Sequence, residues 1–63
     1  MMFKMIEVVG SSNLSYSEAV KSAIEELKKE GYKIHFFELI EQRGALRSEQ
    51  IEYQIKIKVA VEP

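Results

Sequence analysis

The segment Tyr32–Arg43 is the feature that most constrains the fold, because it predicts a strand with apolar side chains on both faces. A strand with only one covered face alternates apolar and polar residues. A chain of 63 residues has few other elements with which to cover both faces. We therefore expect the second face to meet another copy of the protein or a ligand. Under strict alternation the two faces are Ile34, Phe36 and Ile40 on one side, and Phe37 and Leu39 on the other.

The length predicts a single domain, residues 1–63. Domains of this size bury only about 60% of the surface of the unfolded chain and usually need disulfides, metals or partner subunits. The chain has no Cys, so disulfides and thiolate metal sites are excluded. His35 is the single His and cannot build a usual zinc site alone. Self-association is the remaining way to stabilise the domain.

The charge pattern excludes several classes of function. Nine basic and ten acidic residues are spread along the chain, with no basic block of the kind that reads a nucleic-acid backbone. The segment Met1–Gly10 is neither a signal peptide nor a membrane span, so we expect a soluble, cytoplasmic protein. A nucleophile–base pair, a metal cluster and a phosphate loop are all missing, which argues against an enzyme.

One helix is predicted over Ser15–Glu30. Ser15 and Glu18 have the spacing of a capping box, in which each side chain can satisfy a free backbone N–H at the helix start. Gly31 suits the left-handed position that ends helices. An apolar stripe at three- and four-residue spacing is formed by Tyr16, Val20, Ala23, Ile24 and Leu27.

Three strands surround this helix in the sequence. Met2–Val9 is the first, ended by Gly10, and Tyr32–Arg43 is the second. A polar turn or excursion at Gly44–Glu49 leads to the third strand, Gln50–Val61, which alternates apolar and polar residues almost perfectly. The predicted fold is α+β, with a three-stranded antiparallel β-α-β-β sheet curled around one helix.

Alternation also places the ionisable residues of the second strand. Glu38 and Glu41 are three positions apart, so they are predicted to face opposite ways and not to share a reaction centre. His35 is predicted to point away from its neighbour Phe36 and to be structural or exposed.

Two segments have a distinctive sequence: Lys4–Ser12 reads K-M-I-E-V-V-G-S-S, and Phe36–Gly44 reads F-F-E-L-I-E-Q-R-G. In this order they resemble the opening K-x-I-E-L-V-G-T-S and the segment W-F-E-V-V-E-x-R-G of the dodecins, a family of small flavin-binding proteins. The resemblance extends over nearly the whole chain. It is completed by Ser15, Ala19, Ala23 and Ile24 in the helix and by Tyr53, Gln54, Lys56 and Lys58 in the third strand.

The resemblance implies an architecture and a function. Dodecins wrap a three-stranded sheet around one helix, and twelve copies, built as trimers, form a hollow sphere. Flavins such as FMN, riboflavin or FAD bind in pairs between subunits. The family stores or sequesters flavin and is not catalytic.

The resemblance also implies three cofactor-binding residues. Phe36 occupies the position of the Trp that stacks on the flavin ring, Gln54 that of a Gln that contacts the ring edge, and Arg43 that of an Arg that approaches the phosphate. This chain has no Trp, and Phe offers a smaller and less electron-rich ring.

Each of these residues also has an ordinary structural interpretation. Phe36 can pack at a subunit interface, Gln54 can form a cross-strand hydrogen bond, and Arg43 can be a solvated strand end. The alternative function is a dodecin-fold assembly or scaffold that has lost flavin binding with the stacking Trp.

Overall fold

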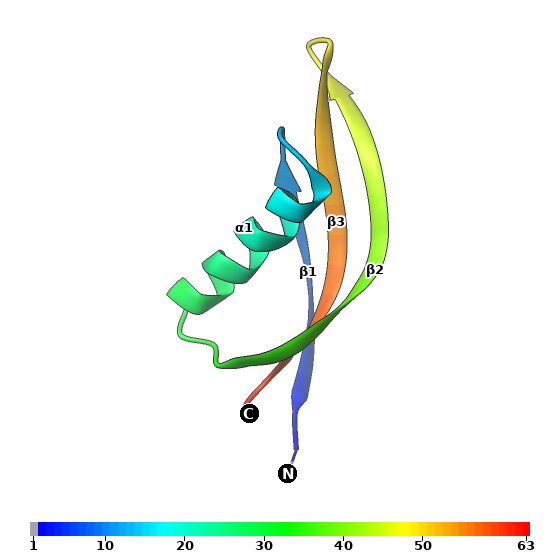
Figure 1. Cartoon of the computed structure of the whole chain (residues 1–63). Helices are drawn as coiled ribbons and strands as arrows, with labels where there is room; N and C mark the ends of the chain where they lie inside the picture. The colour runs from blue at the N-terminus through cyan, green and yellow to red at the C-terminus, as the bar shows by residue number, and fades with distance from the viewer. Residues whose placement is uncertain (1) are drawn as a thin grey trace.

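Residues 2–63 form one helix and three strands in the predicted order β-α-β-β. The computed structural model describes residues 2–63, and Figure 1 shows the arrangement of its elements. The elements are β1 (Lys4–Ser12), α1 (Tyr16–Lys29), β2 (Ile34–Arg47) and β3 (Gln50–Val61). The sheet order is β1-β3-β2, and both outer strands run antiparallel to β3. The predicted fold class is confirmed.

Helix α1 begins and ends where the local sequence predicts. The Ser15 side chain accepts a hydrogen bond from the backbone N–H of Glu18 at 3.0 Å, which satisfies one free donor of the first turn. Gly31 follows the helix with φ of +93°, a backbone conformation that glycine adopts without a steric penalty. The helix therefore has a fixed start and a fixed stop, with Lys28 and Lys29 in its last turn.

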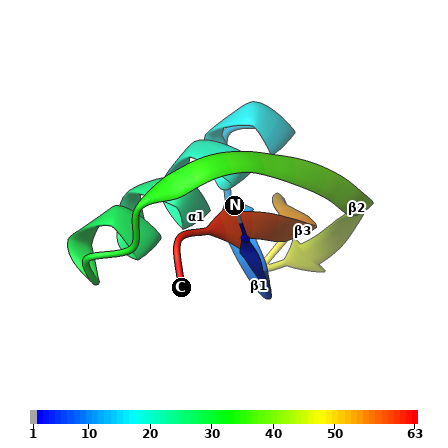
Figure 2. The ribbon, with the colours of Figure 1, turned by 90° about the horizontal axis from the view of Figure 1, so that it is seen from below.

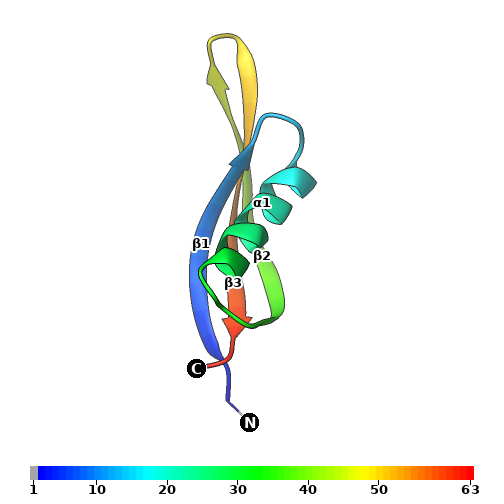
Figure 3. The ribbon, with the colours of Figure 1, turned by 90° about the vertical axis from the view of Figure 1, so that its left-hand side faces the viewer.

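The core lies between α1 and the central strand β3. The predicted bounds of β3 and the apolar face of its alternation are confirmed, with Ile55, Ile57, Val59 and Val61 fully buried. Ile51 belongs to the same face but is half exposed, because the β2–β3 hairpin extends beyond the end of α1 (Figures 1 and 3). From the helix, the buried residues that contact this face are Ala19, Ala23 and Leu27.

The prediction that Gly10 ends the first strand is wrong, because Gly10 lies inside β1. The strand β1 continues to Ser12, and Gly10 pairs with Ile55 of β3. A Cβ at this position would lie 2.6 Å from the carbonyl oxygen of Ala19 and 2.9 Å from the Cβ of Ala23. Glycine is present here because the backbone of α1 packs directly against the strand.

The predicted polar turn Gly44–Glu49 is mostly strand. Pairing of β2 with β3 continues to Arg47 and Gln50, which leaves a turn of two residues, Ser48 and Glu49. Both have positive φ, 51° and 65°, as tight hairpin turns whose twist matches that of the strands require.

Two irregularities in β2 change which residues share a face. The second register shift lies between Leu39 and Glu41 and leaves Ile40 as an extra residue. Glu38 pairs with Lys58 and Glu41 with Lys56, which are two residues apart in β3. Both carboxylates therefore lie on the face opposite α1, the outer face, and the prediction that they face opposite ways is wrong.

The first register shift lies at His35. Ile34 pairs with Val61 and Phe36 with Ala60, which are adjacent in β3 and so point to opposite faces. The prediction that Ile34 and Phe36 share a face is therefore wrong: Ile34 packs against the core and Phe36 lies on the outer face.

Apolar side chains remain exposed on both faces of the sheet. Helix α1 contacts mainly β1 and β3, and Figure 2 shows β2 curving along its length. Phe37 and Leu39 pair with Val59 and Ile57 on the helix side but stay 46% and 45% exposed. The outer face also exposes Met5 and Phe36. A single copy of the chain, with extents of 46 × 21 × 13 Å, thus leaves apolar surface uncovered on each side.

Candidate functional site

Phe36 lies at one end of the outer face, within a cluster of three rings. The ring of Phe3 is 5.7 Å from that of Phe36, in an edge-to-face arrangement, and 4.8 Å from that of His35. Because the Phe3 ring contacts both His35 and Phe36, the prediction that His35 points away from Phe36 is wrong. His35 also contacts the Glu62 carboxylate, 3.2 Å from its Nε2. Phe36 remains 46% exposed, so part of its ring is free to stack on another flat group.

Arg43 and Gln54 form a hydrogen-bonded pair on the outer face, toward the β2–β3 hairpin. They are opposite each other in the β2–β3 ladder, and Arg43 donates from Nε to Gln54 Oε1 at 2.6 Å. Arg43 also donates from Nη1 to Glu41 at 3.3 Å. Its side chain is more than half exposed, and the guanidinium keeps unused N–H groups, which suit an anion such as a phosphate.

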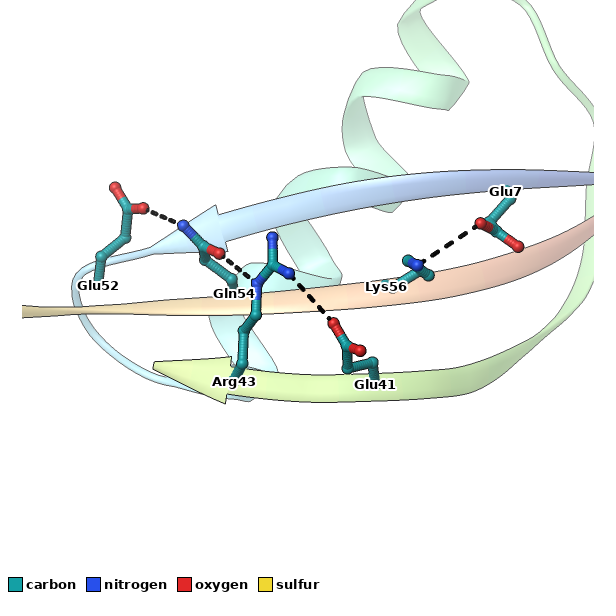
Figure 4. Close-up of polar contacts among 6 residues, drawn as sticks. All are labelled: Glu7, Glu41, Arg43, Glu52, Gln54 and Lys56. Atoms are coloured by element: carbon teal, nitrogen blue, oxygen red, sulfur yellow. Dashed lines mark hydrogen bonds and ion pairs between the residues drawn. The ribbon is translucent and has the colours of Figure 1, made fainter. Parts of the chain in front are cut away.

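Glu52 extends this pair into a network, which Figure 4 shows as a row of side chains along the two strands. Gln54 donates from Nε2 to Glu52 Oε1 at 2.6 Å, and Arg47 donates from Nε to the same oxygen at 3.2 Å. Sequence reasoning did not single out Glu52 or Phe3. Glu52 could have been found because it precedes Gln54 by two residues, and residues two positions apart in a strand lie on the same face.

The pKa of Glu52 lies below its ordinary value of 4.5. The main cause is the hydrogen bond from the Gln54 amide, which stabilises the ionised carboxylate. Partial burial acts in the opposite direction, and the nearby charge and hydrogen bond of Arg47 lower the pKa further. Because the folded pKa is below the unfolded one, ionised Glu52 favours the folded state above pH 4.5, and this contribution disappears as the pH falls through the folded pKa.

Replacing Gln54 with Ala is expected to raise the pKa of Glu52 toward 4.5, because the largest stabilising contact of the carboxylate is removed. Carbon-detected NMR of the Glu52 carboxyl group during an acid titration measures this midpoint. Arg47→Gln is the comparison and should raise the pKa less. An unchanged midpoint in the Gln54 variant would contradict the assignment of the amide as the main cause.

The three predicted site residues share the outer face but do not meet within one chain. Phe36 is opposite Ala60, whereas Arg43 is opposite Gln54, six residues away along β3. At about 3.3 Å per residue this separates them by roughly 20 Å. Arg43 and Gln54 are therefore brought together, and Phe36 is not. A flat ligand that touches Phe36 and Gln54 at once fits these residues only if they come from different copies of the chain.

No helix among residues 2–63 is both long enough and apolar enough to cross a membrane.

Comparison with solved structures finds proteins of similar fold that match nearly the whole chain. The calcium dodecin of Mycobacterium tuberculosis, described as a calcium-chelating antigen, is similar with a TM-score of 0.89 and 28% identity, covering 100% of this chain and 91% of that one. The dodecin of Streptomyces davaonensis has a TM-score of 0.89 and 25% identity, covering 98% and 93%. A Trp-to-Phe mutant of the Thermus thermophilus dodecin has a TM-score of 0.86 and 30% identity, covering 95% and 91%.

No curated protein matches the sequence. The dodecin family model matches residues 2–62, which is almost the entire chain. Together with the shared β-α-β-β fold, this match shows that the chain belongs to the dodecin family.

Proposed function

We propose that this protein assembles into a hollow homododecamer and stores flavin at junctions between its subunits, without turning over a substrate. The observation that carries the proposal is the separation of Phe36 from Arg43 and Gln54 on one face of the sheet. Within one chain these groups are too far apart for a common ligand. Between copies, the exposed ring and the polar pair can meet.

Exposed apolar surface supports the assembly. Compact monomers of 7.3 kDa expose about 4,200 Å² by the usual scaling with mass, whereas this chain exposes 4645 Å². The excess includes side chains on both faces of the sheet, among them Phe37 and Leu39 on one side and Phe36 on the other. Contact with further copies is the arrangement that removes both surfaces from water.

The chemistry of the side chains fits a flavin. Phe36 offers an exposed ring for stacking on the isoalloxazine. Gln54 offers an amide donor and acceptor for the polar ring edge, and Arg43 offers free guanidinium N–H groups for the phosphate of FMN or FAD. A flavin bound in this way would be held and shielded by the assembly.

The direct test combines size-exclusion chromatography, light scattering and a flavin titration on one purified sample. We expect a mass near twelve times 7.3 kDa and quenching of riboflavin and FMN fluorescence at micromolar protein. A single folded chain near 7 kDa would contradict the assembly. A full-sized assembly that neither quenches nor retains flavin would contradict the binding function alone.

Replacing Phe36 with Trp is expected to tighten flavin binding about two- to tenfold, because indole gives a larger stacking surface, and aromatic pairs contribute roughly 0.5–1.5 kcal/mol. The matched control is Phe37→Trp, since Phe37 is equally exposed but lies on the helix side of the sheet. Isothermal titration with riboflavin measures both variants, with light scattering to confirm equal assembly. Equal affinities for the two variants would exclude Phe36 as the stacking residue.

A second candidate function is an assembly that does not bind flavin. The contact that favours it is the edge-to-face packing of Phe3 on Phe36, which already gives the ring an aromatic partner within the chain. Together with the absence of Trp, this would leave Phe36 as ordinary interface packing. A colourless assembly with no affinity for added flavin supports this candidate, and a yellow protein with stoichiometric flavin excludes it.

A further inference from the structure

The amide of Gln54 is held between two different partners, and this fixes which way it faces. Its carbonyl oxygen accepts from Arg43 Nε at 2.6 Å, and its nitrogen donates to Glu52 at 2.6 Å. A carboxylate can only accept hydrogen bonds, and a guanidinium can only donate them. The reversed orientation would place the carbonyl against Glu52 and the N–H₂ group against Arg43, so both contacts would become repulsive.

Counting the hydrogen-bonding groups shows what Gln54 still offers to a ligand. A primary amide has two N–H donors and two carbonyl lone pairs. The contacts with Glu52 and Arg43 use one of each. One donor and one acceptor remain, with the acceptor on the Arg43 side and the donor on the Glu52 side.

Glu52 is itself anchored, which makes it suitable as a support. Its oxygen also accepts from Arg47 Nε at 3.2 Å, and its side chain is only 27% exposed. A carboxyl group whose pKa lies at or below the ordinary value of 4.5 is ionised near neutral pH, so the contact is with a carboxylate. Arg47 contacts Glu52 from β2, and Arg43 and Glu41 are the neighbouring charged groups along the network.

We propose that Glu52 is a positioning residue that sets the orientation of the Gln54 amide and thereby selects flat heterocycles with an imide edge, a ring N–H flanked by carbonyls. The fixed carbonyl of Gln54 accepts from the ring N–H, and its remaining N–H donates to an adjacent ring carbonyl. This inference rests on the proposed flavin site, since the pyrimidine ring of a flavin carries such an edge at N3. It adds the residue that decides which ring edge is accepted.

The test compares riboflavin with N3-methylriboflavin, which lacks the ring N–H. In the unaltered protein, methylation is expected to weaken binding about five- to tenfold, the size of one hydrogen bond. In Glu52→Gln the side chain at position 52 can either donate or accept, so only the contact with Arg43 still favours one orientation and the Gln54 amide turns more easily. The methylation penalty should then fall to about twofold or less. Light scattering confirms that the assembly is retained.

The matched control is Glu7→Gln, which makes the same charge change on the same face, where Glu7 is 3.9 Å from Lys56 and away from Gln54. Its methylation penalty should equal that of the unaltered protein. If Glu52 only stabilised the fold, its replacement would weaken both ligands equally and leave their ratio unchanged, which would overturn the inference. Failure of the unaltered protein to bind riboflavin at all would overturn the flavin proposal together with it.

Discussion

Replacing Leu39 with Glu is expected to abolish self-association. Leu39 is 45% exposed in a single chain, on the part of the sheet that α1 does not cover. A carboxylate there is hydrated in the single chain, but in an assembly that covers this surface it would be removed from water, at a cost of several kcal/mol for each copy. Light scattering is expected to show a large loss of mass, and circular dichroism reports separately how much of the chain stays folded.

The control for this experiment is the same substitution at Leu14. Leu14 is 72% exposed in the turn before α1, away from the sheet surface formed by Phe37 and Leu39. Leu14→Glu should keep the full mass. An assembly of full size in the Leu39 variant would show that the uncovered part of β2 is not a contact between copies.

Replacing Gly10 with Ala is expected to lower the free energy of unfolding by about 1–3 kcal/mol, the usual effect of adding a methyl group to a filled space. The added Cβ would lie 2.6 Å from a backbone oxygen of α1, so the helix would have to move as a whole. A small movement of a flexible side chain could not relieve this contact. Chemical denaturation at one fixed protein concentration measures the change, because self-association makes stability depend on concentration.

Gly44 gives the chain a matched control for Gly10. It also lies in a strand, but a Cβ there would have nothing closer than the Tyr16 hydroxyl at 3.9 Å. Gly44→Ala should therefore leave stability unchanged or raise it by about 0.4–1 kcal/mol through the lower entropy of the unfolded chain. Equal losses in the two variants would show that the close approach of α1 to Gly10 does not limit the packing.

The elements that the sequence predicted well are those specified by short-range patterns. The bounds of α1 follow from the Ser15 cap and from Gly31, each of which acts within one turn of helix. The face of β3 follows from simple alternation over Gln50–Val61. Gly10 was misread because a glycine in a strand can mark either an end or a close approach, and only the position of the helix distinguishes the two.

The errors in β2 have a common physical cause. Its two register shifts, at His35 and Ile40, depend on how β2 aligns with β3, and no residue type marks them locally. Each shift exchanges the faces of all residues that follow it. The hairpin turn was predicted too long, over Gly44–Glu49, because Ser48 and Glu49 are not the Asn and Gly that usually indicate left-handed turn residues.

The site was only partly accessible from the sequence. Phe36, Arg43 and Gln54 were proposed from the resemblance, and the bond between Arg43 and Gln54 depends on the alignment of β2 with β3. The ring contacts of Phe3 come from the N-terminal strand region and could not be inferred from spacing within β2. The roles of Phe36, Arg43 and Gln54 in binding flavin remain predictions.

The distance of roughly 20 Å between Phe36 and Gln54 has a thermodynamic consequence. A molecule held by both side chains bridges two copies, so its binding equilibrium is linked to self-association. Dilution that separates the copies must release the molecule, and saturation must strengthen the junction, by about 2.7 kcal/mol per site at a hundredfold excess over Kd. In such a protein the bound small molecule acts as a reversible cross-link.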